Sequence, residues 1–414
     1  MALIIDESLV FNLGGDMVTD NLILMMKDIP VMRINFDALI YEVLSERHIP
    51  YQIKGKLRQY EYDPSKEGRY NATQMAIAAN SCRDAIISFL SSRVLPLDRD
   101  NAKKILGLLG LEQAQSPEYR AKVALTCRAV SLQDNYWVKS EDDRVSWFEV
   151  DLRQNKLSEI VAQVALHGSS LTLQGKVHTP ELTTNGAYAK CWRRENGQLY
   201  LYKKGANGDD EARIEVEVSN ILDKCNVRHL KYSKAMDEKV YCCKCECMTD
   251  EDLSMLSAMD FASYCNVNGM DFGTEIMKID KDSIYKMLIV DYLISNRDRH
   301  GQNWGFWYHC NDMEIVGCHP LFDHNNSFDR ALMNDSTGGQ SLFDSSKTMS
   351  ELAHMAMKRT DFHFTGEIES EDFIVKSHYH SFMSRAKELG IKTYPEGASL
   401  DRQQSKLNVK TAGT

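Results

Sequence analysis

The spacing of hydrophobic residues changes abruptly near residue 295. From Tyr285 to Leu293 the apolar side chains recur at helical spacing, which predicts a packed helix over residues 283–295. The next residues, SNRDRHGQN from 295 to 303, contain almost no apolar side chain. The pattern therefore predicts a helix that ends in a dense polar loop.

An aspartate follows this loop on the far side of a predicted hairpin. Aromatic residues come first, then a turn at Asn311-Asp312 and a short apolar strand. Asp323 comes directly after Pro320-Leu321-Phe322. Because functional residues concentrate in loops that a packed scaffold carries, we expect the chemistry of this protein here.

The first 125 residues predict a mixed α+β and helical region. Residues 1–60 predict a strand, a helix from Asp37 to about Arg47, and another strand. Apolar residues at helical spacing then predict three helices, over residues 73–95, 98–111 and 119–129. We expect these helices to serve packing. A DNA-reading helix-turn-helix over 73–111 is the alternative, but the segment lacks a clear basic recognition face.

From residue 126 onward the pattern predicts strands first and helices later. Residues 130–152 predict an aromatic-rich hairpin around an acidic turn. Further strands are predicted at 199–204, 229–232 and 239–248, and helices at 155–167, 213–224, 252–266, 349–357 and 371–389. The chain is polar from residue 393. The whole pattern predicts an α+β protein.

Three side chains in the polar stretch have the spacing that phosphoryl transfer needs. Such a reaction requires a carboxylate to accept a hydroxyl proton, and an amide oxygen and a second carboxylate to hold Mg²⁺. Asp298 and Asn303 are five residues apart, as in a kinase catalytic loop, and Asp323 follows. His300 adds a hydrogen-bond donor. The alternative is a polar helix-terminal loop, where Asp and Asn are also common.

A strand lysine and a helix glutamate lie upstream in the order of a kinase. The strand 199–204 ends in two lysines, and we choose Lys203 because it shares a face with Leu199 and Leu201, with Lys204 as the alternative. On the next predicted helix Glu215 is the preferred partner and Glu217 the competitor. A charged strand end and a solvated helix face are the simpler interpretations.

A small turn precedes the lysine strand. Thr183, Thr184, Asn185 and Gly186 come before it, and exposed backbone N–H groups in such a loop can cradle phosphates. A single glycine is also what a plain β-turn at Asn185-Gly186 requires.

Composition narrows the class of protein. The 414 residues suffice for two to three domains, with 43% hydrophobic and 26% charged residues. The net charge of −10 argues against a general nucleic-acid binder, so we expect no direct nucleic-acid contact. No apolar run approaches the ~20 residues of a membrane span. The N-terminus lacks the basic start of a secretory signal, and eleven cysteines then indicate reduced thiols and a cytoplasmic protein.

The cysteines include one cluster that could suggest a metal site. Cys242, Cys243, Cys245 and Cys247 lie within six residues. The segment has the pattern of a strand, and no C-x-x-C pair or nearby histidine spacing accompanies it. We therefore expect no metal there.

Two segments together resemble a known family. The motif NRDRHGQN followed by PLFD is similar to the N-x-D-x-H-x-x-N and later Asp of HipA-like serine/threonine kinases. Gly186-Ala187 followed by Lys190 is similar to the G-A-x-x-K segment of their nucleotide loop. A weaker similarity runs to the D-R-H-x-x-N of phosphatidylinositol-kinase-like enzymes. The resemblance covers about residues 130–390.

The resemblance implies a bilobed protein-kinase-like fold with ATP and Mg²⁺ as cofactors. The divisions would be an N-terminal region of unknown role (1–125), an N-lobe (126–248), a helical C-lobe (249–392) and a polar tail (393–414). The connection after residue 246 would contact adenine through backbone groups.

The resemblance also implies the role of each site residue. Asp298 would act as catalytic base, with His300 and Asn296 fixing its loop, while Asn303 and Asp323 bind Mg²⁺. The nucleotide would be held by a further set: Gly186 and Lys203, with Glu215 orienting that lysine. In this family the nucleotide loop carries a self-phosphorylated serine three residues before the glycine, and Thr183 occupies that position here.

Three functions remain open from the sequence. The first is a serine/threonine protein kinase, with a protein substrate and an antitoxin or repressor partner, as in toxin–antitoxin systems. The second is a small-molecule or lipid kinase, although no membrane-binding segment is visible. The third is a nucleotide-binding interaction protein without transfer activity. The presence of Asp298, Asn303 and Asp323 together argues against the third.

Overall fold

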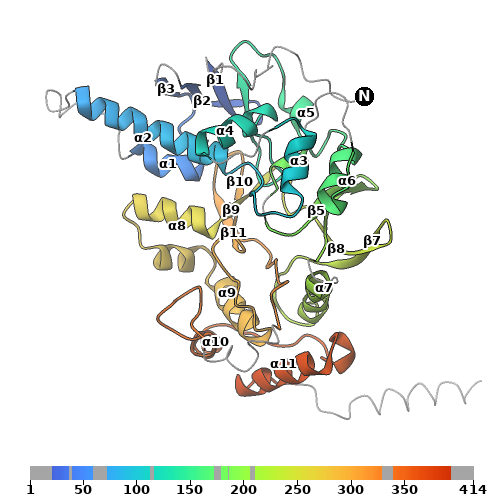
Figure 1. The fold of residues 1–414 in the computed structure, drawn as a ribbon. Helices are drawn as coiled ribbons and strands as arrows, with labels where there is room; N and C mark the ends of the chain where they lie inside the picture. The colour runs from blue at the N-terminus through green and yellow to red at the C-terminus, as the bar shows by residue number, and fades with distance from the viewer. Residues whose placement is uncertain are drawn as a thin grey trace, which may run out of the picture. The chain divides into compact units, whose positions relative to one another are not determined.

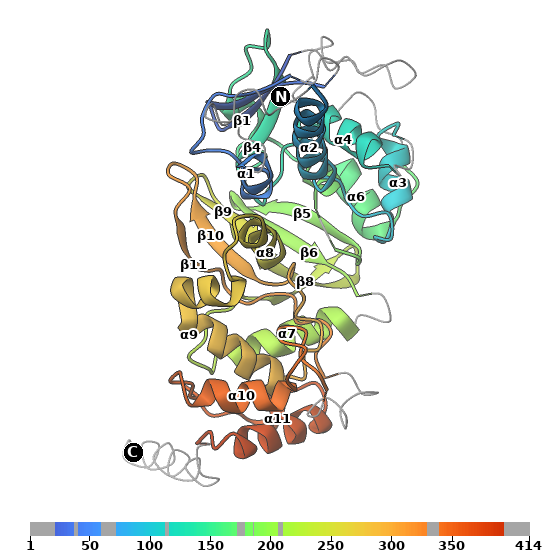
Figure 2. The same ribbon diagram turned by 90° about the vertical axis from the view of Figure 1, so that its left-hand side faces the viewer.

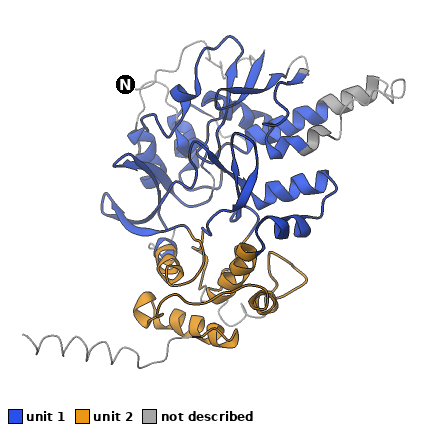
Figure 3. Cartoon of the chain, turned by 180° about the vertical axis from the view of Figure 1, so that it is seen from behind, with its two compact units in different colours: residues 1–213, 230–281, 300–322 blue, residues 214–229, 282–299, 323–414 orange. Residues whose placement is uncertain are grey.

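In a computed structural model of the protein, the described residues are 21–36, 40–58, 72–111, 116–171, 179–184, 186–205, 210–328 and 339–392. The chain divides into two compact units (Figure 3). The first comprises residues 1–213, 230–281 and 300–322, and the second comprises residues 214–229, 282–299 and 323–414.

The first unit begins with an antiparallel sheet in the order β3-β2-β1-β4. Its strands are β1 (Leu22–Met26), β2 (Ile29–Asn35), β3 (Ile40–Val43) and β4 (Tyr136–Ser140). The core of the sheet includes Met26 and Trp137, both fully buried. β1, which is labelled in Figure 1, pairs along the whole length of β4, from which it is separated by more than a hundred residues; Figure 2 labels both strands.

Three predicted elements around this sheet are wrong. The helix predicted over 37–47 contains β3 instead, and the strand predicted after it is helix α1 (Tyr51–Arg58). The hairpin predicted over 130–152 has only its first strand, β4. Its second half begins helix α5 (Trp147–Val150), which starts with a capping box between Ser146 and Glu149.

Four helices of the first unit agree with predicted ones in approximate place. They are α2 (Ala72–Ser91), α3 (Ala102–Leu108), α4 (Pro117–Thr126) and α6 (Glu159–His167). α2 packs on α1 and α4, and α3 packs on α6, so these helices form a layer that serves packing, as expected (Figure 2).

A second four-stranded sheet carries the lysine strand. Its order is β5-β6-β8-β7, all antiparallel, with β5 (Lys190–Glu195), β6 (Gln198–Lys203), β7 (Ser233–Asp237) and β8 (Val240–Glu246). A short 3₁₀ turn, η3 (Pro180–Leu182), precedes β5, and α6 packs on β5. The strand predicted at 229–232 lies a few residues later, as β7.

A three-stranded sheet completes the first unit, in the order β11-β10-β9. The strands are β9 (Leu253–Ser257), β10 (Gly305–His309) and β11 (Ile315–Cys318), and β10–β11 is the predicted hairpin. The helix predicted from residue 252 is wrong in its first turn, because β9 occupies 253–257 and helix α8 (Ala258–Val267) begins after it. α8 packs on β9, β10 and α1.

The second unit is helical. Helices α7 (Asp210–Leu222) and α9 (Phe272–Leu293) each have residues in both units, and α9 leaves helical geometry at Asp280. The unit also contains α10 (Met349–Met357), the turn η4 (Ser370–Asp372) and α11 (Lys376–Glu388).

Helix α11 connects the parts of this second unit. His378 donates through Nδ1 to the carboxylate of Glu217 on α7 at 3.0 Å, and its ring stacks on Phe328. Arg385 donates to the carbonyl of Leu293 at the end of α9 and to the hydroxyl of Ser295. These contacts of Arg385 therefore fix the start of the loop that follows α9.

The described residues mix helices and strands, which confirms the α+β class. The bilobed kinase-like arrangement and the divisions at residues 125, 248 and 392 stay predictions, and the tail 393–414 lies outside the described residues. Within the described part of the chain, no helix is both long enough and apolar enough to cross a membrane.

Candidate active site

The predicted site residues are divided between the two units. The first unit contains Thr183, Gly186, Lys203, His300 and Asn303; the second contains Asn296, Asp298, Glu215 and Asp323. Within each unit, hydrogen bonds and packing contacts hold these side chains in place.

In the second unit, Asn296 shapes the start of the polar loop. Its backbone N–H donates to the carbonyl of Asp291 at 2.9 Å, and its side-chain amide donates to the Asp291 carboxylate at 3.2 Å. Its Oδ1 accepts the backbone N–H of Asp298 at 3.1 Å. Asn296 is only 1% exposed, so it fixes the backbone of Asp298 from inside the fold.

A buried ion pair lies under the same loop. Arg299 donates through Nε and Nη2 to the carboxylate of Asp291, at distances of 2.9 to 3.2 Å, and both side chains are buried. Burial raises the pKa of Asp291, and the guanidinium of Arg299 opposes that shift. The guanidinium of Arg299 therefore serves to balance the buried charge of Asp291.

Arg299 also connects the loop to the segment after Asp323. Its Nη2 lies 3.1 Å from Nδ1 of His324, and because a guanidinium only donates, Nδ1 is the acceptor. The backbone N–H of His324 in turn donates to Glu215 Oε2 at 2.9 Å. Glu215, which is 1% exposed, is thus joined to the residue that follows Asp323.

The carboxylate of Asp298 is contacted by the same segment. Asn326 Nδ2 donates to Asp298 Oδ2 at 2.8 Å, and Asn325 Nδ2 donates to Asp323 Oδ1 at 3.3 Å. Asp323 itself adopts a left-handed backbone with φ +60°. Residues that are far apart in sequence, Glu215, Asp298 and the segment from Asp323, therefore form one hydrogen-bonded group in the second unit.

The competitor Glu217 has a different environment. It accepts the backbone N–H of Ile374 at 2.8 Å and contacts His378. It belongs to the packing of α11, which favours Glu215 as the residue of the site.

A small cavity lies beside the loop in the second unit. Its lining includes the guanidinium of Arg297, one residue before Asp298, together with polar and apolar side chains from residues 340–343 and the apolar Leu288, Met349 and Leu352. The cavity provides a partly apolar surface next to the candidate base.

In the first unit, two buried lysines face each other across strands β5 and β6. Lys203 is directly opposite Lys190, so both side chains lie on one face of the sheet, and each is 6% exposed. The alternative, Lys204, is less buried. The Nζ atom of Lys203 also lies 5.4 Å from the centroid of the Tyr232 ring, in a cation–π contact.

Gly186 adjoins this lysine pair. It adopts the left-handed backbone with φ +99°, and a Cβ there would collide with Nζ of Lys190. A glycine is therefore required both by the backbone and by the ammonium group against it.

Thr183 lies at the start of the same loop but is buried. It is 2% exposed, and its hydroxyl donates to the carbonyl of Pro180 at 3.3 Å. Phosphorylation at Thr183 would require this loop to open. Its neighbour Asn185 lies outside the described residues.

The remaining predicted residues lie in a turn held by helix α8. The N–H of Asn303 donates to the carbonyl of His300 at 2.9 Å, and the carbonyl of Gly301 accepts the N–H of Met259 at 2.9 Å. Asn303 is 5% exposed, whereas His300 is exposed. A backbone hydrogen bond thus attaches the turn to the first residues of α8.

Sequence reasoning missed several residues of these networks. Asp291, Arg299, His324 and Asn326 were not identified, and Lys190 entered only as part of a motif. A signal did exist for Asp291, because it is a charged residue within an otherwise apolar helical stretch.

The cysteine cluster lies on or just after β8, and all eleven cysteines are free thiols.

Comparison with known proteins adds the following. No protein-family profile matches the sequence, and no curated protein matches it. Among solved structures, the proinflammatory kinase CtkA of Helicobacter pylori is similar with a TM-score of 0.36 and 14% identity, over 50% of this chain and 88% of that chain.

A second solved structure is similar over more of the chain. It is the toxin–antitoxin complex of HipA, HipB and operator DNA from Shewanella oneidensis MR-1, with a TM-score of 0.46 and 12% identity, over 89% of this chain and 98% of that chain. Neither similarity is close enough to assign a function to this chain.

Proposed function

We propose that the protein is an ATP- and Mg²⁺-dependent phosphotransferase that acts on a serine or threonine hydroxyl. The observation that carries this proposal is the hydrogen-bonded group around Asp298. Its backbone is fixed by Asn296 and its carboxylate by Asn326, while Arg299 is committed to Asp291. Because phosphoryl transfer depends mainly on positioning and electrostatics, a rigidly held carboxylate suits the role of base.

The other roles follow the chemistry of each side chain. Lys203, Lys190 and Gly186 would hold phosphates, since they combine two buried ammonium groups with an accessible backbone. Asn303 and Asp323 supply the oxygen ligands that Mg²⁺ prefers. Bound ATP would supply the transferable phosphoryl group, and Mg²⁺ would neutralise its developing charge. His300 and Glu215 keep the positioning roles that the resemblance gives them.

A protein substrate is the preferred acceptor. The resemblance of NRDRHGQN and PLFD to HipA-like serine/threonine kinases supports this choice over a lipid or small molecule. A repressor-like partner and a cytoplasmic location stay predictions of the HipA-like resemblance.

Transfer of labelled phosphate tests the proposal. The full chain is incubated with Mg²⁺ and ATP labelled in the γ-phosphate, alone and with a protein extract, and labelled residues are mapped by mass spectrometry. Label on serine or threonine, including Thr183, supports the protein kinase. Label only on an added lipid or small molecule would instead support the alternative kinase class. Nucleotide binding without any transfer would overturn the proposal.

A further inference from the structure

The region before residue 171 contacts two backbone segments that the proposed function assigns to the nucleotide. One is the loop 181–190, which contains Gly186 and Lys190. The other is the connection 247–251 that follows β8. Both segments and all their contacts described below belong to the first unit. Lys190 at the end of the loop pairs with Lys203 on β6, and the N–H of Cys247 donates to the carbonyl of Leu199. The other described residues of the two segments belong to no strand, so the directions of their backbone groups depend on other partners.

Arg99 holds three carbonyls of the loop. Its Nη1 donates to the carbonyls of Glu181 at 3.0 Å and Thr184 at 2.8 Å, and its Nη2 donates to the carbonyl of Lys190 at 2.7 Å. Arg99 is 2% exposed. Burial lowers the pKa of its guanidinium to about 10, so the group remains charged at neutral pH. One side chain thus fixes both ends of the turn around Gly186.

Its neighbours hold the middle of the loop. The N–H of Asp100 donates to the carbonyl of Ala187 at 2.7 Å, and Asp100 Oδ2 accepts the N–H of Ala189 at 3.3 Å. The N–H of Leu95 donates to the carbonyl of Leu182 at 2.6 Å. The loop is therefore supported along its length by residues 95–100.

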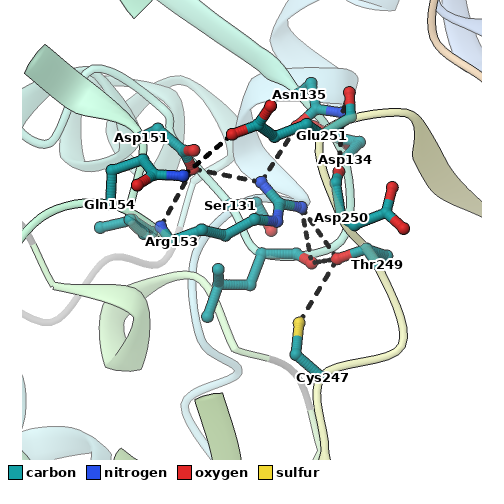
Figure 4. Close-up of polar contacts among 12 residues, drawn as sticks. Ser131, Asp134, Asn135, Asp151, Arg153, Gln154, Cys247, Thr249, Asp250 and Glu251 are labelled. Atoms are coloured by element: carbon teal, nitrogen blue, oxygen red, sulfur yellow. Dashed lines mark hydrogen bonds and ion pairs between the residues drawn. The ribbon is translucent and has the colours of Figure 1, made fainter. Parts of the chain in front are cut away.

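Arg153 performs the corresponding task at the connection after β8 (Figure 4). Its Nη2 donates to Thr249 Oγ1 at 2.8 Å, and the Thr249 hydroxyl donates to the carbonyl of Leu132. Arg153 also pairs with the buried Asp151, at 3.3 Å. In the part of the chain that the structure describes, Arg153 Nε and Asp151 Oδ2 have no hydrogen-bond partner, so the ion pair is incomplete and the contact with Thr249 is the shorter one.

Asn135 extends this support along the connection. Its Nδ2 lies 3.2 Å from the carbonyl of Asp250 and 3.3 Å from that of Glu251, and its Oδ1 accepts from Arg153 at 3.0 Å. Trp307 Nε1 donates to the carbonyl of Met248 at 3.1 Å. The carbonyls of Met248, Asp250 and Glu251 in the connection therefore have fixed directions.

From these contacts we infer that Arg99 and Asp100 position the phosphate-binding loop, and that Arg153, through Thr249, positions the adenine-binding connection. The inference rests on the proposed function. It gives a part in nucleotide affinity to residues 95–100, in the N-terminal region whose role the sequence left open, and to residues 135–153. The two sets of contacts are assigned to different halves of the nucleotide, the phosphates and the adenine. Their effects can therefore be measured separately with ligands that contain only one half.

The test measures binding of three ligands to the full chain in the presence of Mg²⁺: ATP, adenosine and inorganic tripolyphosphate. Loss of one or two hydrogen bonds to a segment corresponds to a change of roughly threefold to tenfold in affinity. Asp100→Ala and Arg99→Lys should weaken ATP and tripolyphosphate by that factor and leave adenosine unchanged. Thr249→Val should weaken ATP and adenosine by one common factor and leave tripolyphosphate unchanged.

Matched variants control for general effects. Asp98→Ala removes a neighbouring exposed carboxylate that, among the described residues, is not one of those that hold the loop, and Thr126→Val removes a hydroxyl that donates to the Val123 carbonyl of its own helix. Both should bind all three ligands as the unmodified chain does. A thermal unfolding scan of each variant shows whether it is folded.

Two results would overturn the inference. Variants that weaken all three ligands equally, or none, would show that these residues support the fold and not the ligand halves. If the unmodified chain binds neither ATP nor tripolyphosphate, the proposed function on which the inference rests is wrong. This outcome needs no variant, so it is distinguished from a failure of the inference alone.

Discussion

At the scale of single residues, the polar loop owes its shape to charges that are buried and paired. Asp291 and Arg299 are each 4% exposed, and their ion pair connects the end of α9 to His324 and thereby to Glu215. Asp298, the candidate base, is fixed by its neighbours without being part of this pair. The loop thus separates charges that support structure from the charge proposed for chemistry.

This separation predicts the effect of breaking the ion pair. Arg299→Met leaves the Asp291 carboxylate buried and uncompensated, so we expect a loss of about 3–5 kcal/mol in the free energy of unfolding. The double variant Asp291→Leu/Arg299→Met should recover a large part of that loss, because no unpaired charge remains. Urea denaturation of the three proteins measures both values. A single variant as stable as the unmodified chain would contradict the structural role of the pair.

The identity of the residues that support the loop could not be predicted from sequence spacing. Asp298, Asn303 and Asp323 stand out because the spacing of chemical groups is local. Arg299 and His324 come from segments 25 residues apart, and Asn326 reaches Asp298 across a similar interval. Such contacts depend on how the chain returns after the β10–β11 hairpin, and one sequence contains no direct signal for that return.

At the scale of elements, the sequence pattern gave the wrong prediction for segments whose structure is decided by pairing with another strand. Residues 37–47 have helical spacing, yet β3 pairs with β2, where Arg33 lies opposite Glu42 and forms an ion pair with it. β9 has only five residues and takes its identity from pairing with β10. Strand pairs of this kind override weak local preferences. Helix α5 was locally detectable, since Ser146 and Glu149 have the spacing of a capping box.

Glycines provide an element-scale test of the β9–β10 pairing. At Gly305 a Cβ would collide with the backbone carbonyl of Leu256 and lie 2.9 Å from Cα of Ser257. Gly305→Ala must therefore push the strands apart, and we expect a loss of about 1–3 kcal/mol. The matched change Gly107→Ala meets no atom within 4 Å inside helix α3 and should raise stability by about 0.5–1 kcal/mol.

Thermal unfolding of these two glycine variants gives opposite expected signs. The midpoint should fall for Gly305→Ala and rise for Gly107→Ala relative to the unmodified chain. Equal midpoints for the two variants would contradict the close strand approach at residue 305.

At the scale of the whole molecule, the proposed function assigns roles to residues of each compact unit. The first unit contains two buried lysines and a glycine loop that residues 95–100 support, and the second contains the carboxylates Asp298 and Asp323. The proposal predicts that changes in either unit abolish transfer. Lys203→Met and Asp323→Asn should each remove phosphate transfer while the protein stays folded, which a transfer assay and an unfolding scan of each variant would check. Full activity in either variant would remove that residue from the mechanism.

The central claim is that the carboxylate of Asp298 accepts the hydroxyl proton, and one comparison tests it most directly. The rate of phosphate transfer from labelled ATP, with Mg²⁺, is measured for the unmodified chain, for Asp298→Asn and for the control Asp312→Asn, which makes the same chemical change in the β10–β11 turn. The account predicts a loss of about 10²- to 10⁴-fold for Asp298→Asn and an unchanged rate for Asp312→Asn. Transfer by Asp298→Asn at the rate of the unmodified chain would contradict it.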